Sequence, residues 1–174
     1  MTKETLRTAL ERNWDEIGQR EKELNGASDR AAAILAAAYF EAKLHDAIMR
    51  EFSIRNRDLS ILLESGEKIF KHNNPIKNFA DKIEIAFALG LYSDEVRKNL
   101  HKIREIRNHF AHASMPITFE HDDISNKCRQ LNLNNFTQPD SLRTKYINYL
   151  KEIEYNIKSK SYPLCEETVD GNGK

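Results

Sequence analysis

Three side chains in the second half of the chain have the types and the spacing to act on a phosphate ester. Arg107, Asn108 and His112 stand within less than two turns of a predicted helix. An arginine can stabilise developing negative charge, and a histidine can accept or release a proton near neutral pH. Helical residues five apart point about 140° apart, so Arg107 and His112 do not share a face, whereas Asn108 and His112 do. All three would meet only in a loosened last turn or across two copies of the chain.

The same stretch also has the pattern of a packed helix. Ile103, Ile106 and Phe110 recur at helical spacing and form an apolar stripe. Arg107 lies next to Ile106 and one turn before Phe110, so we expect it in the core. Because a guanidinium stays charged, a buried arginine needs a carboxylate partner.

Two glutamates are the candidate partners of Arg107. Glu41 interrupts an alanine-rich helical pattern, and Glu84 interrupts an almost wholly apolar one. In this structural interpretation Arg107 forms a buried ion pair with Glu41 or Glu84. Asn108 then hydrogen-bonds a neighbouring helix, and His112 interacts with the carboxyl end of its own helix.

The balance of charged residues limits the kinds of partner that the chain can attract. The chain has 174 residues, and its 27 Lys and Arg balance its 27 Asp and Glu, so it has no net charge to attract nucleic acid in bulk. Arg50, Arg55 and Arg57 form a modest basic cluster, yet no helix-turn-helix pattern follows them, so we do not expect direct sequence-specific DNA binding. RNA remains a candidate partner through a local patch.

Neither a metal site nor a cofactor is predicted. Cys128 and Cys165 are far apart, and the pair His109 and His112 lacks a zinc signature. There is no glycine-rich phosphate loop and no nucleophilic serine or cysteine constellation. No apolar run reaches the ~20 residues of a membrane span, and the first residues do not read as a signal peptide. We therefore expect a cytoplasmic protein.

Helical periodicity runs through most of the chain and predicts an all-α fold, a compact bundle of five or more helices. We expect a single domain over residues 1–158, with its core in 26–135, and a flexible tail over 159–174. The predicted helices cover residues 2–24, 31–48, 79–91, 93–112, 124–131 and 141–157, with a shorter one around 59–70.

Three blocks of the sequence, residues 28–41, 79–91 and 103–112, together resemble the mannitol operon repressor family. The resemblance spans residues 26–135. It implies an all-helical bundle that acts in transcriptional repression of sugar-alcohol uptake. Because the family has no recognisable DNA-binding motif, the resemblance also implies action through a protein partner.

A second resemblance points to a different class of function. The element Arg107-Asn108-x-x-x-His112 is similar to the signature of HEPN domains, helical bundles that dimerise and include metal-independent ribonucleases. It implies that Arg107, Asn108 and His112 would contact or cleave RNA. The leading hypothesis is a homodimeric, non-enzymatic transcriptional regulator that binds another protein, and the alternative is a HEPN-type endoribonuclease of the toxin or defence kind.

Overall fold

The computed structural model describes residues 18–55, 76, 78–131 and 140–161, and all regular structure in this part of the chain is helical. The prediction of an all-α fold is confirmed. The helices are α2 (Asp29–Arg55), α4 (Phe79–Ala88), α5 (Asp94–His112), α6 (Asp122–Arg129) and α7 (Leu142–Ser161), preceded by helical residues 18–26. None of the helices in these ranges combines the length and apolarity needed to cross a membrane.

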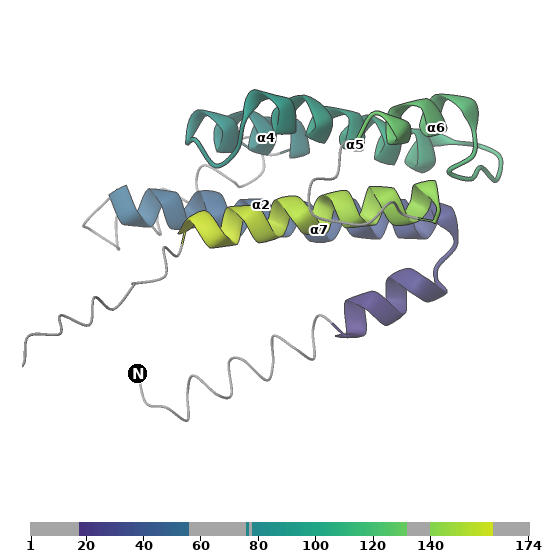
Figure 1. Cartoon of the computed structure of the whole chain (residues 1–174), viewed down its shortest axis with the longest axis horizontal. Helices are drawn as coiled ribbons and strands as arrows, with labels where there is room; N and C mark the ends of the chain where they lie inside the picture. The colour runs from purple at the N-terminus through teal and green to yellow at the C-terminus, as the bar shows by residue number, and fades with distance from the viewer. Residues whose placement is uncertain (1–17, 56–75, 77, 132–139, 162–174) are drawn as a thin grey trace, which may run out of the picture.

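The helices form two layers (Figure 1). The long helices α2 and α7 lie side by side in one layer, and α4, α5 and α6 make up the other. Residues 18–26 lie on the far side of the first layer, away from α4 and α5. Since α2 packs against α4, α5 and α7, it is the central helix of the bundle.

Alanines allow α2 to approach its neighbours closely. Ser28 precedes the helix, and its hydroxyl accepts a hydrogen bond from the amide of Ala31 at 3.3 Å, which satisfies one of the free donors of the first turn. Small side chains at buried positions bring helix axes together. The buried alanines of α2 are Ala32, Ala33, Ala36, Ala37 and Ala47.

Local signals fix both ends of α4. Asn78 caps its start, accepting from the amide of Asp81 at 3.0 Å, while the Asp81 carboxylate accepts from the amide of Asn78 at 3.3 Å. This reciprocal pair is a capping box. At the other end Gly90 has φ +78°, and the amide of Leu91 donates to the carbonyl of Ala86 at 3.0 Å. That pattern is a Schellman motif, which turns the chain directly into α5.

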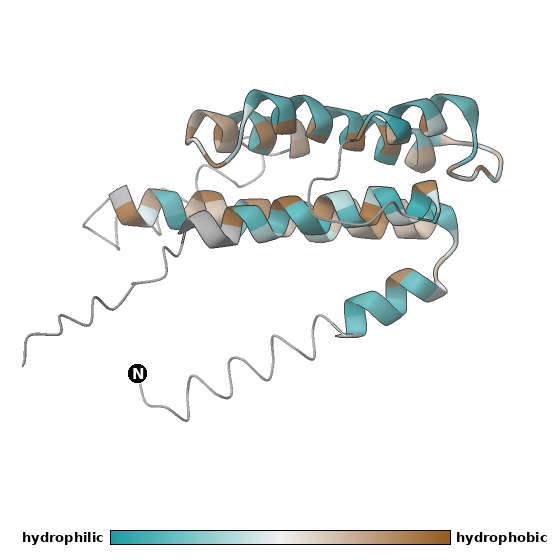
Figure 2. Cartoon of the chain, in the orientation of Figure 1, coloured by the Kyte–Doolittle hydropathy of each residue, from teal (hydrophilic) through white to brown (hydrophobic). Residues whose placement is uncertain are grey.

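The apolar stripes meet between the two layers (Figure 2). Brown segments gather on the sides of α4 and α5 that face α2 and α7. Ile103, Ile106 and Phe110 of α5 are fully buried, as their spacing predicted. An apolar stripe of α7 is also buried, at Tyr146, Tyr149, Leu150, Ile153 and Ile157.

The boundaries differ from the sequence prediction in places. The helix predicted over 79–91 ends at Ala88, and its Ala88 is exposed, so α4 is less enclosed than its apolar sequence indicated. The last helix runs on to Ser161, beyond the predicted end at Ile157. The helix predicted around 59–70, the first part of the one over 2–24 and the tail from residue 162 lie outside the described residues.

Replacing Gly90 by alanine should destabilise the protein by about 1–2 kcal/mol, because a Cβ is disfavoured at positive φ. The measurement is the free energy of unfolding in urea. Gly26 is the matched control: it is exposed, its φ is not positive, and no atom lies within 4 Å of the added Cβ. We expect Gly26→Ala to be neutral or slightly stabilising. Equal effects of the two substitutions would contradict the αL cap.

Candidate functional site

The carboxyl end of α5 is held in place by the first turn of α2. The helix ends at His112, and Arg30 of α2 donates from its Nη2 to the carbonyls of Ala113 at 2.5 Å and Met115 at 2.9 Å. The neighbouring Asp29 accepts from the amide of Phe119 at 3.1 Å. Two consecutive residues of α2 therefore position the connection that follows α5.

A shallow, open hollow of about 410 Å³ lies at this end of α5. It brings Asn108 and His112 together, as their shared helical face predicted. His109 also contributes from α5, and His121 contributes from the residue before α6. The lining residues are Asn108, His109, His112, Ala113, Ile117 and His121.

Arg107 does not line this hollow. It is half-buried, and its positive charge acts on Tyr146 of α7. Burial raises the pKa of the Tyr146 hydroxyl, and the charge of Arg107 opposes that effect. The hydroxyl donates to the carbonyl of Ala33 at 3.1 Å. Of the three predicted site residues, the hollow thus brings together Asn108 and His112 but not Arg107.

The carboxylates predicted to pair with Arg107 bind other cations. Glu41 Oε1 lies 2.7 Å from Lys82 Nζ. Glu84 lies 3.1 Å from Arg97 Nη1 and 2.7 Å from His101 Nε2. The structure does not form the predicted ion pairs of Arg107 with Glu41 or Glu84. Because Arg107 keeps part of its surface in water, its charge does not require a buried partner.

A histidine beside the Glu41–Lys82 pair has a perturbed proton affinity. His45 lies one turn after Glu41 on α2. Burial lowers the pKa of His45 below its ordinary value of 6.5, the charge of Lys82 lowers it further, and Asp46 partly opposes both. Burial and the charge of Lys82 together therefore favour the neutral form of the His45 imidazole.

The described residues offer little for metal or thiol chemistry. Among them, no group of three or more His, Cys, Asp or Glu is arranged to hold a metal ion. Cys128 is buried in α6, and burial raises the pKa of its thiol to about 12, so it is not a thiolate nucleophile at neutral pH. Cys165 lies outside the described residues.

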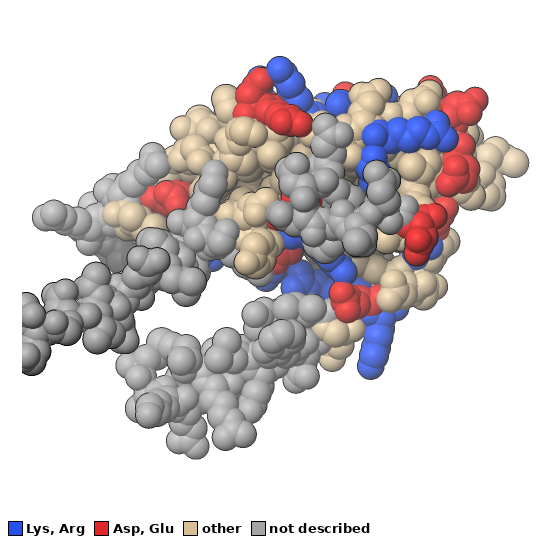
Figure 3. Space-filling model, in the orientation of Figure 1, with Lys and Arg blue, Asp and Glu red and all other residues tan. Residues whose placement is uncertain are grey.

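Charges of both signs are mixed among the described residues on the face shown in Figure 3. On the face shown, Lys and Arg alternate with Asp and Glu, and the coloured residues form no broad patch of one sign. This arrangement agrees with the zero net charge of the chain. The described residues on this face therefore form no continuous basic stripe of the kind typical of a nucleic-acid interface.

Sequence reasoning missed the residues that position the site. Arg30 stands in the first turn of α2, where the helix dipole disfavours a positive charge. That misplaced charge was the available signal that its side chain has a partner elsewhere. His121 carried no comparable signal, because only the fold brings it near His112.

No family model matches the chain, and no curated protein matches it. Its fold is similar to a chain in the X-ray structure of the MtlR–HPr complex from Escherichia coli, with a TM-score of 0.58 and 14% sequence identity. The match covers 79% of this chain and 94% of that chain. The likeness shows a shared helical fold over most of both chains.

Arg30→Ala should lower the free energy of unfolding by about 1.5–3 kcal/mol, because it removes charge-assisted hydrogen bonds to two carbonyls. Arg107→Ala should cost about 1 kcal/mol or less, since it breaks no ion pair with Glu41 or Glu84. Urea titrations of both variants test this order. A loss of about 3–5 kcal/mol for Arg107→Ala would instead restore the buried ion pair of the sequence prediction.

Stability should fall as the pH is lowered through the region just below 6.5. The unfolded chain protonates His45 near 6.5, whereas the folded protein protonates it only at a lower pH. The unfolded state thus binds more protons in this interval, and the free energy of unfolding decreases with decreasing pH. His45→Gln should flatten the pH dependence of urea unfolding between about pH 7 and 5. An unchanged slope would show that His45 is not the responsible group.

Proposed function

We propose that this chain is a non-enzymatic regulator that represses transcription by binding another protein, in the manner that the mannitol operon repressor resemblance implies. The observation that carries the proposal is the fold. It is similar over 94% of the length of a chain that was crystallised in a complex of MtlR with HPr. The resemblance of the three sequence blocks and the fold likeness both support this proposal.

The geometry at the end of α5 agrees with a binding role. Asn108 and His112 line an open hollow, where they can donate to or accept from a docked protein. Arg107 does not line this hollow, which supports a binding role for the hollow rather than RNA cleavage by Arg107 and His112 of one chain. We propose a homodimer as the working form and the cytoplasm as its location.

The partner proposal is tested by binding. We expect the purified protein to bind the HPr of its own organism, measured by isothermal titration calorimetry and size-exclusion chromatography. Loss of the gene should raise transcription of the regulated operon. If HPr does not bind, while deletion still raises transcription, the repression proposal holds and HPr is excluded as the partner. If neither result is obtained, the proposal fails.

The ribonuclease alternative is tested with the same preparation. Wild type and His112→Ala are incubated with mixed RNA in EDTA, after circular dichroism has shown that both are folded. Since His112 is exposed and ends its helix, its replacement should not unfold the protein. We expect no cleavage by either protein. Cleavage by wild type alone would overturn the non-enzymatic proposal and identify a metal-independent ribonuclease.

A further inference from the structure

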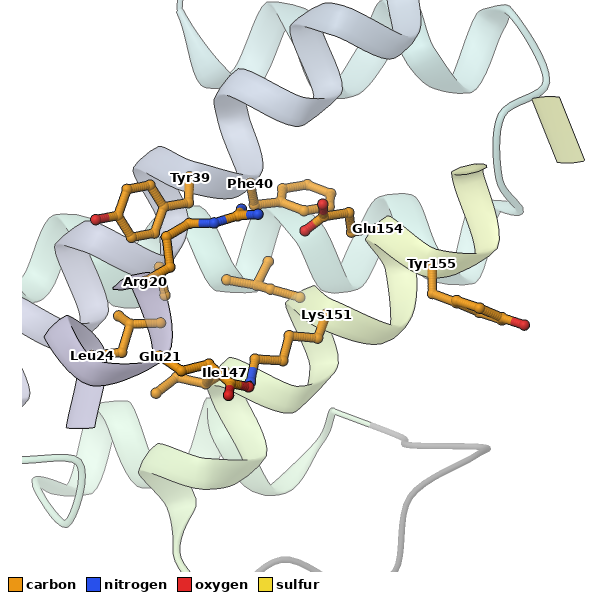
Figure 4. Close-up of a pocket in the computed structure, with 11 residues that line it drawn as sticks. Arg20, Glu21, Leu24, Tyr39, Phe40, Ile147, Lys151, Glu154 and Tyr155 are labelled. Atoms are coloured by element: carbon orange, nitrogen blue, oxygen red, sulfur yellow. The ribbon is translucent and has the colours of Figure 1, made fainter. Parts of the chain in front are cut away.

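A second hollow lies between helical residues 18–26, α2 and α7 (Figure 4). Its volume is about 220 Å³, and it is separate from the histidine-lined hollow at the end of α5. Its inner wall is apolar and comes from all three elements. The wall residues are Leu24, Ala36, Phe40, Ile147 and Leu150.

Charged side chains surround the mouth of this hollow. Glu21 Oε1 accepts from Lys151 Nζ at 2.7 Å, which links the first helix to α7. Arg20 lies over the ring of Tyr39, with its guanidinium carbon 5.7 Å from the ring centroid. Figure 4 shows Arg20 and Lys151 on two sides of the opening. The lining therefore combines an apolar interior with two cationic groups, on Arg20 and Lys151, and two carboxylates, on Glu21 and Glu154. A ligand carboxylate would thus reach Lys151 by exchange with Glu21.

The link between Glu21 and Lys151 is weak enough to be exchanged. The two side chains are 53% and 42% exposed, and ion pairs in such surroundings contribute little to stability. Burial does not oppose a change of partner either, because both groups already contact water. An incoming carboxylate can thus replace Glu21 at the ammonium of Lys151.

The volume sets the size of a ligand. A dry apolar cavity of about 150 Å³ holds benzene, and nucleotide-sized or drug-sized ligands use about 300–1,000 Å³. A hollow of about 220 Å³ accommodates one phenyl ring with a short side chain. Phe40 offers an aromatic neighbour for such a ring, and Ala36 leaves the space that the ring would occupy.

We propose that this hollow binds a small apolar molecule with one carboxylate, of about the size of 3-phenylpropionate. The ring lies against Phe40 and Leu150, and the carboxylate accepts from Lys151 in place of Glu21. The ligand thereby bridges residues 18–26, α2 and α7. This site does not depend on the proposed protein partner, because none of its residues lines the hollow at the end of α5.

The apolar part of the proposal is tested by filling the hollow. 3-Phenylpropionate is titrated into the full chain and followed by calorimetry or ligand-observed NMR, with an expected Kd on the order of 0.1–1 mM. Ala36→Leu should weaken binding at least tenfold, because the added side chain occupies the site. Ala38→Leu is the matched control, on the same helix but exposed and outside the lining, and should bind like wild type.

The charged part is tested by a pair of substitutions with opposite expected signs. Glu21→Gln removes the competitor for Lys151 and should tighten 3-phenylpropionate binding about two- to fivefold. Lys151→Gln should weaken it by a similar factor. Neither substitution should change the binding of 3-phenylpropionamide, which has the same shape without the charge.

Three results would overturn the inference. The first is the absence of binding to wild type at millimolar 3-phenylpropionate. The second is an equal loss in Ala36→Leu and Ala38→Leu. The third is an identical response of the acid and the amide to the Glu21 and Lys151 substitutions. If circular dichroism shows that Ala36→Leu is unfolded, Ile147→Phe fills the same hollow from a half-buried position on α7 and decides the question.

Discussion

The close packing of α2 against three other helices is the constraint on which the rest of the structure depends. Its alanines remove the side-chain bulk that would otherwise hold α4, α5 and α7 apart. Larger side chains then fill the space from the partners' sides, as Ile103 and Ile106 of α5 and Tyr146 of α7 do. A larger residue at Ala32 or Ala33 would overpack this interface, because interiors have little free volume. The polar features of the molecule lie around this packed centre.

The first turn of α2 extends that packing into a polar junction. Arg30 binds the carbonyls that follow α5. Asp29 accepts from Phe119 and, at 3.1 Å, from Arg143 near the start of α7. Arg143 also donates to the carbonyl of Leu24 at the end of the first helix. One cluster thus joins the ends of four segments whose main contacts lie elsewhere along their lengths.

Much of the fold could be predicted from the sequence, because helical periodicity is a local property. The burial of Ile103, Ile106 and Phe110 follows directly from their spacing. The start of α5 after Ser93 was also predictable, because a capping residue acts on the turn next to it in the sequence. The helical fold is also shared with a chain of the MtlR–HPr complex at 14% identity. Periodicity, however, identifies a face of a helix and not the residue that lies opposite it.

The partners of charged residues could not be predicted for that reason. Glu41 was expected to meet Arg107, but the helix packing places Lys82 beside it at 2.7 Å. Choosing between two cations requires the rotation of α4 about its axis and its position along α2, and neither is encoded locally. The pairing of Asn108 with His112 in one hollow was predictable because both residues belong to a single helix. His121 joins them from a different element, so its place depends on the whole fold.

The polar junction formed by Asp29, Arg30 and Arg143 contacts one lining residue of each hollow. Leu24 lines the apolar hollow, and its carbonyl accepts from Arg143. Ala113 lines the histidine hollow, and its carbonyl accepts from Arg30. Asp29 binds Arg143 at 3.1 Å and directly precedes Arg30 in the sequence, so the two contacts belong to one cluster. The ends of the helices that line the two hollows are therefore fixed by one set of hydrogen bonds, made by Asp29, Arg30 and Arg143.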